Sequence, residues 1–281
     1  MTKQGVKICF IGGDDRQKYA AEELSSYVET SAFGDCYEDS TRIFRSDNLI
    51  KSLHNSKAII LPLPASKVEK YADFEMISGY AKENGSLILG GCFSQYMKNM
   101  MDSMKINYCD YYYDEPFTIE NAYITAEGAI NIISNELKKT LTDTSFALLG
   151  YGRIGCALCE MLSSLKCDVR VYARREESLA LARQRGIKGS LLNEYNKYFE
   201  DVIINTIPSR VISSSQLLEM KEGTLIVELA SAPGGFDFEI AEQSGLKTIN
   251  GGGLPGKYAP QSAGKKVAKV LLKILKKERL L

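Results

Sequence analysis

The chain has 281 residues, of which 44% are hydrophobic and 25% are charged, and its 35 basic and 35 acidic side chains give a formal net charge of zero. This composition is typical of a globular protein, and the length favours two cores over one. The balanced charge removes the simplest electrostatic argument for nucleic-acid binding, and no apolar run approaches the roughly 20 residues that span a bilayer. The first apolar run leads directly into glycine and acid, so we expect a strand there and no signal sequence.

The first part of the chain alternates between short apolar runs and longer polar segments. The runs expected to form strands are 6–11, 58–63, 86–89 and 106–109, and the segments expected to form helices include 16–29 and 67–84. This alternation is typical of a parallel sheet with helices on both faces. A tyrosine-rich and acidic stretch at 110–116 breaks the pattern, so residues 1–117 are predicted to form a flavodoxin-like substrate domain.

A second alternating series begins after a long helical segment, 118–143, that would connect the two domains. Its expected strands are 145–149, 168–172, 201–206, 224–229 and 247–249, and its expected helices are 153–165, 176–185, 214–220 and 238–244. We therefore expect an α/β protein with two doubly wound parallel-sheet domains, the second a Rossmann NAD(P)-binding domain at 144–258. Ligands of such sheets bind at the carboxyl ends of the strands, and we expect the chemistry in a cleft between the domains.

The last segment, 259–281, is rich in lysine. Its apolar residues recur at helical spacing and are Val267, Val270, Leu271, Ile274 and Leu275. The lysines therefore form the solvated face of an amphipathic helix, for which packing on the N-terminal domain is one arrangement. A patch that binds phosphate or a partner is the alternative.

The glycine turn that follows the strand 145–149 is the most specific motif. Gly150 permits a tight turn, Gly152 lets the backbone approach a pyrophosphate, and Gly155 allows close packing of helix on strand. Arg153 and Ile154 complete the turn, and the helix that it opens directs its positive end at the phosphates. These residues predict a dinucleotide site.

The type of dinucleotide depends on the residues about 20 positions later, where an NAD site usually places a carboxylate. Ala173, Arg174 and Arg175 stand there instead. Two guanidinium groups suit the 2′-phosphate of NADP, which is the cofactor that we expect. Arginines that only decorate a helix start are the alternative.

Two later strand ends are expected to border the nicotinamide end of this site. Asn205 and Thr206 end one strand, and Pro208 prevents its continuation. Ala230 and Ser231 follow the next strand, and we assign Ser231 to the substrate.

Polar residues after the first strand are candidates for binding a substrate. They are Gly13, Asp15, Arg16 and Gln17. An arginine there could bind a carboxylate. Capping explains acids at a helix start, but it explains Arg16 less well because a cation meets the unfavourable end of the helix dipole.

Two further groups complete the candidate site. Asn121, Thr125 and Glu127 interrupt the apolar stripe of the connecting helix. Gly256 and Lys257 lie in a glycine- and proline-rich loop after the last strand, where the lysine could bind a second carboxylate. A solvated loop lysine is the alternative.

Several residue types argue against other chemistries. His54, the single histidine, lies in a polar segment and is predicted to be on the surface, so no histidine relay is expected. Cys156 and Cys159 lie inside the Rossmann helix, where packing is favoured over a redox role. No metal site is expected. The seven unpatterned cysteines fit reduced thiols and a cytoplasmic location.

Seven motifs, taken together and in order, resemble the A subunit of dipicolinate synthase over nearly the whole chain. They are GGDDRQ at 12–17, LPLP at 61–64, TAEGA at 125–129, LGYGRIG at 149–155, NTIP at 205–208, ASAPGGFD at 230–237 and GLPGK at 253–257. Ile124 and Glu228 depart from the family pattern, in which a proline and an aspartate are expected.

The resemblance implies oxidation of dihydrodipicolinate to dipicolinate, a pyridine-2,6-dicarboxylate, with NADP taking the hydride. It also implies the mother cell of a sporulating bacterium and a partner, the flavoprotein-like B subunit, and we expect a homo-oligomer. Arg16 and Lys257 would hold the two carboxylates from opposite domains, and Asn121, Thr125 and Glu127 are counted with them as catalytic candidates. A dehydrogenase of another small amino or hydroxy acid, or a nucleotide-binding regulatory subunit that is inactive without its partner, is the alternative.

Overall fold

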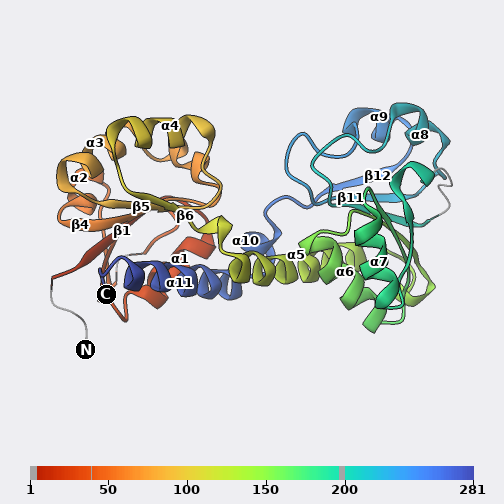
Figure 1. The fold of residues 1–281 in the computed structure, drawn as a ribbon, viewed down its shortest axis with the longest axis horizontal. Helices are drawn as coiled ribbons and strands as arrows, with labels where there is room; N and C mark the ends of the chain where they lie inside the picture. Colours follow the sequence, from red (N-terminus) through yellow and green to blue (C-terminus); the bar gives the residue numbers. More distant parts are fainter. Residues whose placement is uncertain (1–4, 39, 196–199) are drawn as a thin grey trace. The chain divides into compact units, whose positions relative to one another are not determined.

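The structure is a computed structural model that describes residues 5–38, 40–195 and 200–281. It consists of two compact units, one formed by Met1–Asn121 with Pro255–Leu281 and the other by Ala122–Leu254. Each unit contains a six-stranded parallel sheet with helices on both faces (Figure 1). The expected fold class, two doubly wound α/β units, is confirmed.

The sheet of the first unit has the strand order β3-β2-β1-β4-β5-β6. Its strands are β1 (Lys7–Ile11), β2 (Glu29–Phe33), β3 (Ile43–Arg45), β4 (Ser56–Ile60), β5 (Leu87–Gly90) and β6 (Tyr108–Asp110). Its helices are α1 (Asp15–Leu24), α2 (Leu49–Leu53), α3 (Phe74–Asn84), α4 (Gln95–Met104), α10 (Leu254–Tyr258) and α11 (Pro260–Lys277), with short 3₁₀ turns at Ala65–Lys70 and Tyr111–Tyr113. The long helix α5 (Glu115–Glu136) begins in this unit and ends in the other.

Side chains of β1 alternate between the two faces of this sheet. Ile8 and Phe10 join the core formed with α1 and α11, whereas Cys9 and Ile11 join the core formed with α2, α3 and α4. Figure 1 shows the two helix layers on opposite sides of the sheet. The period of two along a strand that is buried on both faces produces this division.

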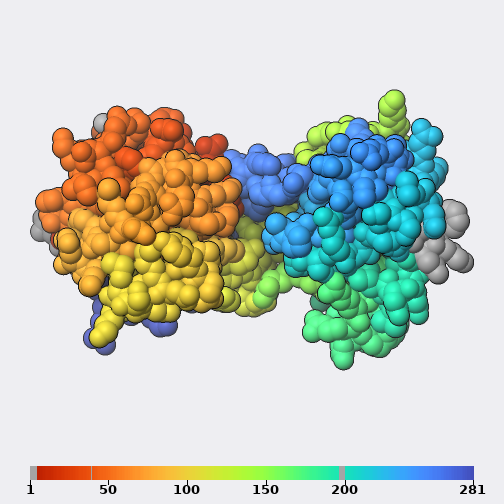
Figure 2. Space-filling model, turned by 90° about the horizontal axis from the view of Figure 1, so that it is seen from above, coloured from red at the N-terminus to blue at the C-terminus, as the bar shows by residue number. Residues whose placement is uncertain are grey.

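The C-terminal helix α11 packs on α1 and completes the first core. All five apolar residues of the predicted stripe, from Val267 to Leu275, are buried. The two helices approach closely at Gly264, since a Cβ built there would lie 2.7 Å from the backbone oxygen of Arg16. Figure 2 looks onto the other face of this unit, so that only the edge of the C-terminal helix, in dark blue, is visible there.

The sheet of the second unit has the order β12-β11-β10-β7-β8-β9. Its strands are β7 (Ser145–Leu149), β8 (Asp168–Ala173), β9 (Lys188–Leu191), β10 (Val202–Asn205), β11 (Leu225–Glu228) and β12 (Lys247–Asn250). Its other helices are α6 (Arg153–Ser164), α7 (Glu176–Gln184), α8 (Ser214–Glu219) and α9 (Phe238–Gln243), with short turns at Leu141–Asp143 and Leu192–Glu194. One face of the sheet packs against α8 and α9, and α6 and α7 cover the other (Figure 1).

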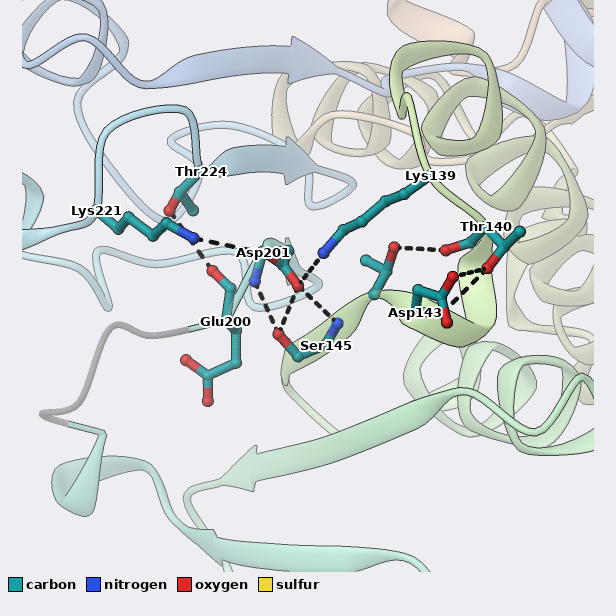
Figure 3. A network of polar contacts seen from close by, with 9 residues as sticks. Lys139, Thr140, Asp143, Ser145, Glu200, Asp201, Lys221 and Thr224 are labelled. Carbon is teal, nitrogen blue, oxygen red and sulfur yellow. Dashed lines mark hydrogen bonds and ion pairs between the residues drawn. The ribbon is translucent and has the colours of Figure 1, made fainter.

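A polar network ties the amino-terminal ends of β7 and β10 together (Figure 3). The carboxylate of Asp201 accepts hydrogen bonds from the backbone N–H and the hydroxyl of Ser145 at 3.0 and 2.9 Å. It also forms an ion pair with Lys139 at 2.7 Å. Although burial raises the pKa of Asp201, these partners lower it to about 2.

The structure differs from the expected elements in several places. The strands β2, β3 and β9 and the helices α2 and α4 were not predicted. The expected helix 67–84 is divided into a 3₁₀ turn and α3, which begins after Asp73 because the side chain of Asp73 accepts from the N–H of Glu75. The helix α10 belongs to the first unit, whereas the pattern of elements placed residues up to 258 in the second.

Candidate functional site

The glycine turn of the second unit lies at the point where the strand order reverses, between β7 and β10. The N–H of Thr206, after β10, donates to the carbonyl of Leu149 at 2.9 Å. Gly150 has φ +104°, and a Cβ there would lie 2.3 Å from Oγ1 of Thr206. Both the backbone conformation and the close approach therefore require glycine at this position.

The other two glycines differ in what surrounds them. A Cβ on Gly155 would lie 2.3 Å from the carbonyl oxygen of Gly150, so this glycine allows α6 to start against the strand. Gly152 has an ordinary φ of −86° and nothing within 4 Å of a Cβ. No internal contact of the described chain therefore explains the glycine at 152.

Gly152 is also the N-cap residue of α6, and no side chain caps this helix end. The first N–H groups of a helix have no partner within the helix, and the helix dipole favours an anion there. Arg153 and Ile154 form the first turn, in which Arg153 is exposed and Ile154 half-buried. The end of α6 thus has the geometry of a phosphate site.

The end of β8 carries the residues expected to contact the ribose. Ala173 is buried, and Arg174 and Arg175 are both exposed. Arg174 donates a hydrogen bond from its guanidinium to the hydroxyl of Ser209. Arg175 is the N-cap residue of α7 and makes no side-chain capping bond there.

Arg174 lines a pocket of about 440 Å³ in the second unit. The other residues that line it are Leu191, Leu192, Asn193, Tyr195, Arg210, Val211 and Gln216. They come from the ends of β8 and β9 and from the segment after β10, which is where a doubly wound sheet binds the adenosine part of a dinucleotide.

A buried carboxylate organises the strand ends next to the glycine turn. Glu228 is 2% exposed and accepts hydrogen bonds from the side-chain amide of Asn205 at 2.8 and 3.0 Å. It also accepts from the backbone N–H groups of Ala230 at 2.8 Å and Gly235 at 2.6 Å. Burial raises the pKa of Glu228 even though these donors lower it. Asn205 is fully buried, so it acts in this network as a scaffold of the strand end.

The remaining predicted residues of this edge lie near that network. Pro208 is exposed and Thr206 and Ala230 are half-buried, in the loops that follow β10 and β11. Ser231 is exposed in the same loop as Ala230.

In the first unit, Arg16 forms a bidentate ion pair with Asp14. Its Nε and Nη2 donate to the two carboxylate oxygens at 2.9 and 2.7 Å, and Nη2 also donates to the carbonyl of Leu63 at 3.0 Å. Arg16 is 4% exposed. Although burial raises the pKa of Asp14, the hydrogen bonds and charge of Arg16 outweigh this and lower it. The guanidinium is therefore held rigidly at the carboxyl ends of β1 and β4, next to the point where this sheet also reverses its strand order.

Neighbouring residues fix the same turn. The buried side chain of Gln17, with its nitrogen toward Asp14, donates to that carboxylate at 3.1 Å and accepts from the N–H of Leu63 at 3.2 Å. The hydroxyl of Tyr71 donates to the carbonyl of Gly13 at 2.7 Å. Asp15 is exposed at the first position of α1.

The segment with Lys257 is a short helix, α10, and not the irregular loop that its glycines and prolines predict. It lies against the Asp14–Arg16 pair within the first unit. A Cβ on Gly256 would lie 2.6 Å from Oδ2 of Asp14 and 2.8 Å from Nε of Arg16. Lys257 is exposed on α10, one residue further. The expectation that Arg16 and Lys257 belong to opposite domains is thus wrong, because the chain returns to the first unit at Pro255.

The three candidates on α5 do not share one face. Asn121 and Thr125 are one helical turn apart, and Thr125 is buried, whereas Glu127 is exposed on another side of the helix. The structure therefore aligns two of the three.

The structure also describes the residues for which no catalytic role is expected. His54 is exposed, and Cys156 and Cys159 are free thiols within α6, of which Cys159 is buried. In the described parts of the chain, no helix is long and apolar enough to cross a membrane.

Reasoning from the sequence missed four structural features: the pairing of Asp14 with Arg16, the carbonyl of Leu63 beside it, Arg210 in the lining of the pocket, and the buried carboxylate of Glu228. The Asp-x-Arg spacing at a helix start was a usable signal for the first. The other three depend on contacts between distant segments, which no local pattern of residues indicates.

Comparison with known proteins finds similar A subunits of dipicolinate synthase. Residues 7–112 match the family described as the N-terminal domain of the dipicolinate synthase A subunit. The A subunit of dipicolinate synthase from Bacillus subtilis (strain 168) is 29% identical over 285 residues, with 96% of each chain covered.

Solved structures of other proteins resemble this chain along nearly its whole length. The crystal structure of the dipicolinate synthase A subunit from Bacillus halodurans has a TM-score of 0.86 at 28% identity, and covers 98% of this chain and 99% of that one. The transhydrogenase of Sinorhizobium meliloti, at 14% identity, shares the fold with a TM-score of 0.71 over 96% of this chain and 94% of its own. With its two doubly wound units, the chain is similar along nearly its whole length to A subunits of dipicolinate synthase, and its residues 7–112 match the family of their N-terminal domain.

Proposed function

We propose that the chain is an NADP-dependent dehydrogenase that oxidises dihydrodipicolinate to dipicolinate. The observation that carries the proposal is the glycine turn at the strand reversal of the second unit. There an uncapped helix end and a glycine with no internal neighbour form a site for a pyrophosphate. The family supplies the substrate class.

The residues of the second unit fit a dinucleotide. Backbone N–H groups of the turn at Gly150, Gly152, Arg153, Ile154 and Gly155 would hold the pyrophosphate. Ala173 and Arg174 would contact the adenosine ribose, and Arg175, which follows them at the start of α7, would add mainly its charge. Asn205, Thr206, Pro208 and Ala230 would border the nicotinamide. When bound, the cofactor supplies the hydride acceptor.

The residues of the first unit would bind the substrate through its carboxylates. Arg16 is buried and oriented by Asp14, and Lys257 lies one residue beyond the glycine that touches this pair. Gly13, Asp15, Gln17 and Gly256 lie around the same ion pair and would help to bind the substrate. Ser231, in the second unit, stays a prediction as a substrate contact. Asn121, Thr125 and Glu127 remain candidates for positioning it.

The reaction removes a hydride and a proton from the ring and leaves an aromatic pyridine. Aromatisation lessens the need for a strong base, in keeping with the exposed position of the single histidine, His54. Orientation of the substrate would supply much of the rate.

The chain is related to one component of an enzyme with more than one kind of subunit. We propose that its partner is a flavoprotein-like B subunit, that the chain itself forms a homo-oligomer, and that it acts in the cytoplasm of the mother cell of a sporulating bacterium.

Calorimetry with purified protein tests nucleotide binding. Gly152→Asp places a carboxylate where the pyrophosphate would lie, and the open space around Gly152 means that the fold should tolerate it. The variant should unfold at the temperature of the parent protein and lose NADP binding. A parent protein that binds neither NADP nor NAD would refute the proposed function.

Two substitutions separate cofactor choice from substrate binding. Arg174→Asp should weaken NADP binding, and an unchanged affinity would refute the NADP assignment. Arg16→Ala should raise the KM for dihydrodipicolinate and leave NADP binding unchanged. Assays with amino and hydroxy acids, and assays with and without the B subunit, distinguish the alternative activities.

A further inference from the structure

We infer that Arg210, together with Arg174, forms the site that recognises the 2′-phosphate of the nucleotide. This inference rests on the proposed NADP dependence and adds a specificity-determining residue to it. Arg210 lies far from Arg174 in the sequence, in the segment between β10 and α8.

The pocket that both arginines line has a distinctive composition. Of its eight lining residues, two are arginines, and among the lining residues that the structure describes there is no aspartate or glutamate. An NAD site places a carboxylate against the ribose hydroxyls, and that carboxylate would repel a phosphate. Two cations in a lining without aspartate or glutamate favour the phosphorylated ribose.

The pocket is also large enough and suitably lined for the adenosine part of the nucleotide. Its volume of about 440 Å³ is within the usual range of small-molecule sites. Leu191, Leu192 and Val211 supply apolar surface, and Tyr195 supplies an aromatic ring on the same lining. The arginines thus lie beside a surface that suits a purine.

A hydrogen bond connects the two segments that carry the arginines. The guanidinium of Arg174 donates to the hydroxyl of Ser209, the residue immediately before Arg210. This bond brings the loop after β10 to the end of β8, so that the positive charges of both side chains act on the same volume. A phosphate that is bound by two guanidinium groups gains charge-assisted hydrogen bonds from each.

Arg175 occupies a different position. It precedes α7 and is not among the residues that line the pocket. The second guanidinium is therefore supplied by the loop after β10, and the residue next to Arg174 in the sequence contributes less.

Calorimetry with adenosine 2′,5′-bisphosphate, AMP, NADP and NAD tests this assignment on the full-length chain. Arg210→Gln and Arg175→Gln are matched variants, because both remove one exposed guanidinium from the same unit. Arg210→Gln should weaken binding of NADP and of the bisphosphate about tenfold or more, and should change NAD and AMP less than about twofold. Arg175→Gln should change NADP binding less than about threefold.

Each other result has a defined meaning. An unchanged NADP affinity in Arg210→Gln, or an equal loss of NADP and NAD affinity, would overturn the role of Arg210. A larger loss in Arg175→Gln than in Arg210→Gln would overturn it as well. If the parent protein binds NADP no more tightly than NAD, and adenosine 2′,5′-bisphosphate no more tightly than AMP, this inference fails but the proposal of dinucleotide binding stands. If the parent binds no nucleotide, the proposed function itself fails.

Discussion

The side-chain amide of Asn205 donates to both carboxylate oxygens of Glu228, at 2.8 and 3.0 Å, across the ends of two adjacent strands. The same carboxylate accepts the backbone N–H groups of Ala230 and Gly235. One buried charge thus satisfies donors from two strand ends and from the loop that follows β11. A buried carboxylate with so many donors is expected to define the shape of that loop.

Glu228→Gln should destabilise the protein and weaken nucleotide binding. A glutamine offers one oxygen, so its NH₂ group would face the N–H of either Ala230 or Gly235, and a buried donor would lose its acceptor. We expect a loss of about 2 kcal/mol in the free energy of unfolding, measured by urea denaturation. The control is Glu222→Gln, at an exposed position just before β11, which should change the free energy of unfolding by less than about 0.5 kcal/mol. Equal effects of the two substitutions would show that the network is unimportant.

Gly256→Ala should disturb the Asp14–Arg16 pair. The added methyl would lie 2.6 Å from Oδ2 of Asp14 and 2.8 Å from Nε of Arg16, so the ion pair has to move. On the proposed function, dipicolinate binding should weaken about tenfold or more, because its carboxylate would meet a displaced guanidinium. NADP binding, which the proposal assigns to the other unit, should not change. Calorimetry with each ligand measures both effects, and a variant that retains full affinity for dipicolinate would remove Arg16 from the substrate site.

Patterns of apolar residues predicted the well-buried strands but missed β2. Two of its residues, Thr30 and Ser31, are buried although they are polar. The hydroxyl of Ser31 donates to the carbonyl of Ser52 at 2.7 Å, and that of Thr30 to the carbonyl of Val28 at 3.0 Å. Short hydroxyl side chains can be buried when such acceptors are present, and the acceptors are not visible in the sequence.

The candidate site, like the fold, could be predicted from the sequence only in part. The glycine turn was predictable because its residues are consecutive and each has a local physical role. The neighbours of Arg16 and Arg174 were not, since Gly256 and Ser209 reach them only after the chain has folded. The apolar stripe of α11 likewise predicted a buried face, but it could not show that α1 is the helix that covers it.

Gly264→Ala tests how tightly α11 packs on α1. A Cβ at this position would lie 2.6 Å from Cβ of Tyr19 and 2.7 Å from the backbone oxygen of Arg16, and neither can move without shifting α1. We expect a loss of about 1–3 kcal/mol in the free energy of unfolding. Because α1 begins next to Arg16, binding of dipicolinate should weaken as well.

Gly79→Ala is the matched control for that substitution. Gly79 also lies within a helix, α3, but a Cβ there would have nothing within 4 Å. Alanine is a better helix former than glycine, so this variant should gain about 0.5–1 kcal/mol. Thermal unfolding of the two variants and of the parent measures the expected loss and the expected gain of stability in one experiment. If Gly264→Ala were as stable as Gly79→Ala, this result would refute the claim that α1 and α11 pack too closely at Gly264 to admit a methyl group.

Asp201→Asn should lower stability in a way that depends on pH. The pKa of Asp201 is lowered to about 2 from an ordinary value of 3.8, so the folded state favours the ionised form. The resulting stabilisation is fully present above pH 3.8 and is lost as the pH falls through about 2. Its side chain is 24% exposed, and with allowance for solvent screening we expect a contribution of about 1 kcal/mol at pH 7.

Thermal unfolding of Asp201→Asn and the parent between pH 7 and pH 2 measures this dependence. The difference in stability should be largest at neutral pH and should shrink toward pH 2, because protonation removes from the parent the charge that the variant already lacks. Asp168→Asn provides the comparison, since Asp168 pairs with Lys188 at 3.2 Å on the surface with both side chains about two-thirds exposed. That pair should contribute less than about 0.5 kcal/mol, because water and salt screen exposed charges. A difference for Asp201→Asn that stayed constant over the whole pH range would mean that the hydrogen bonds from Ser145, and not the charge of the carboxylate, hold the ends of β7 and β10 together.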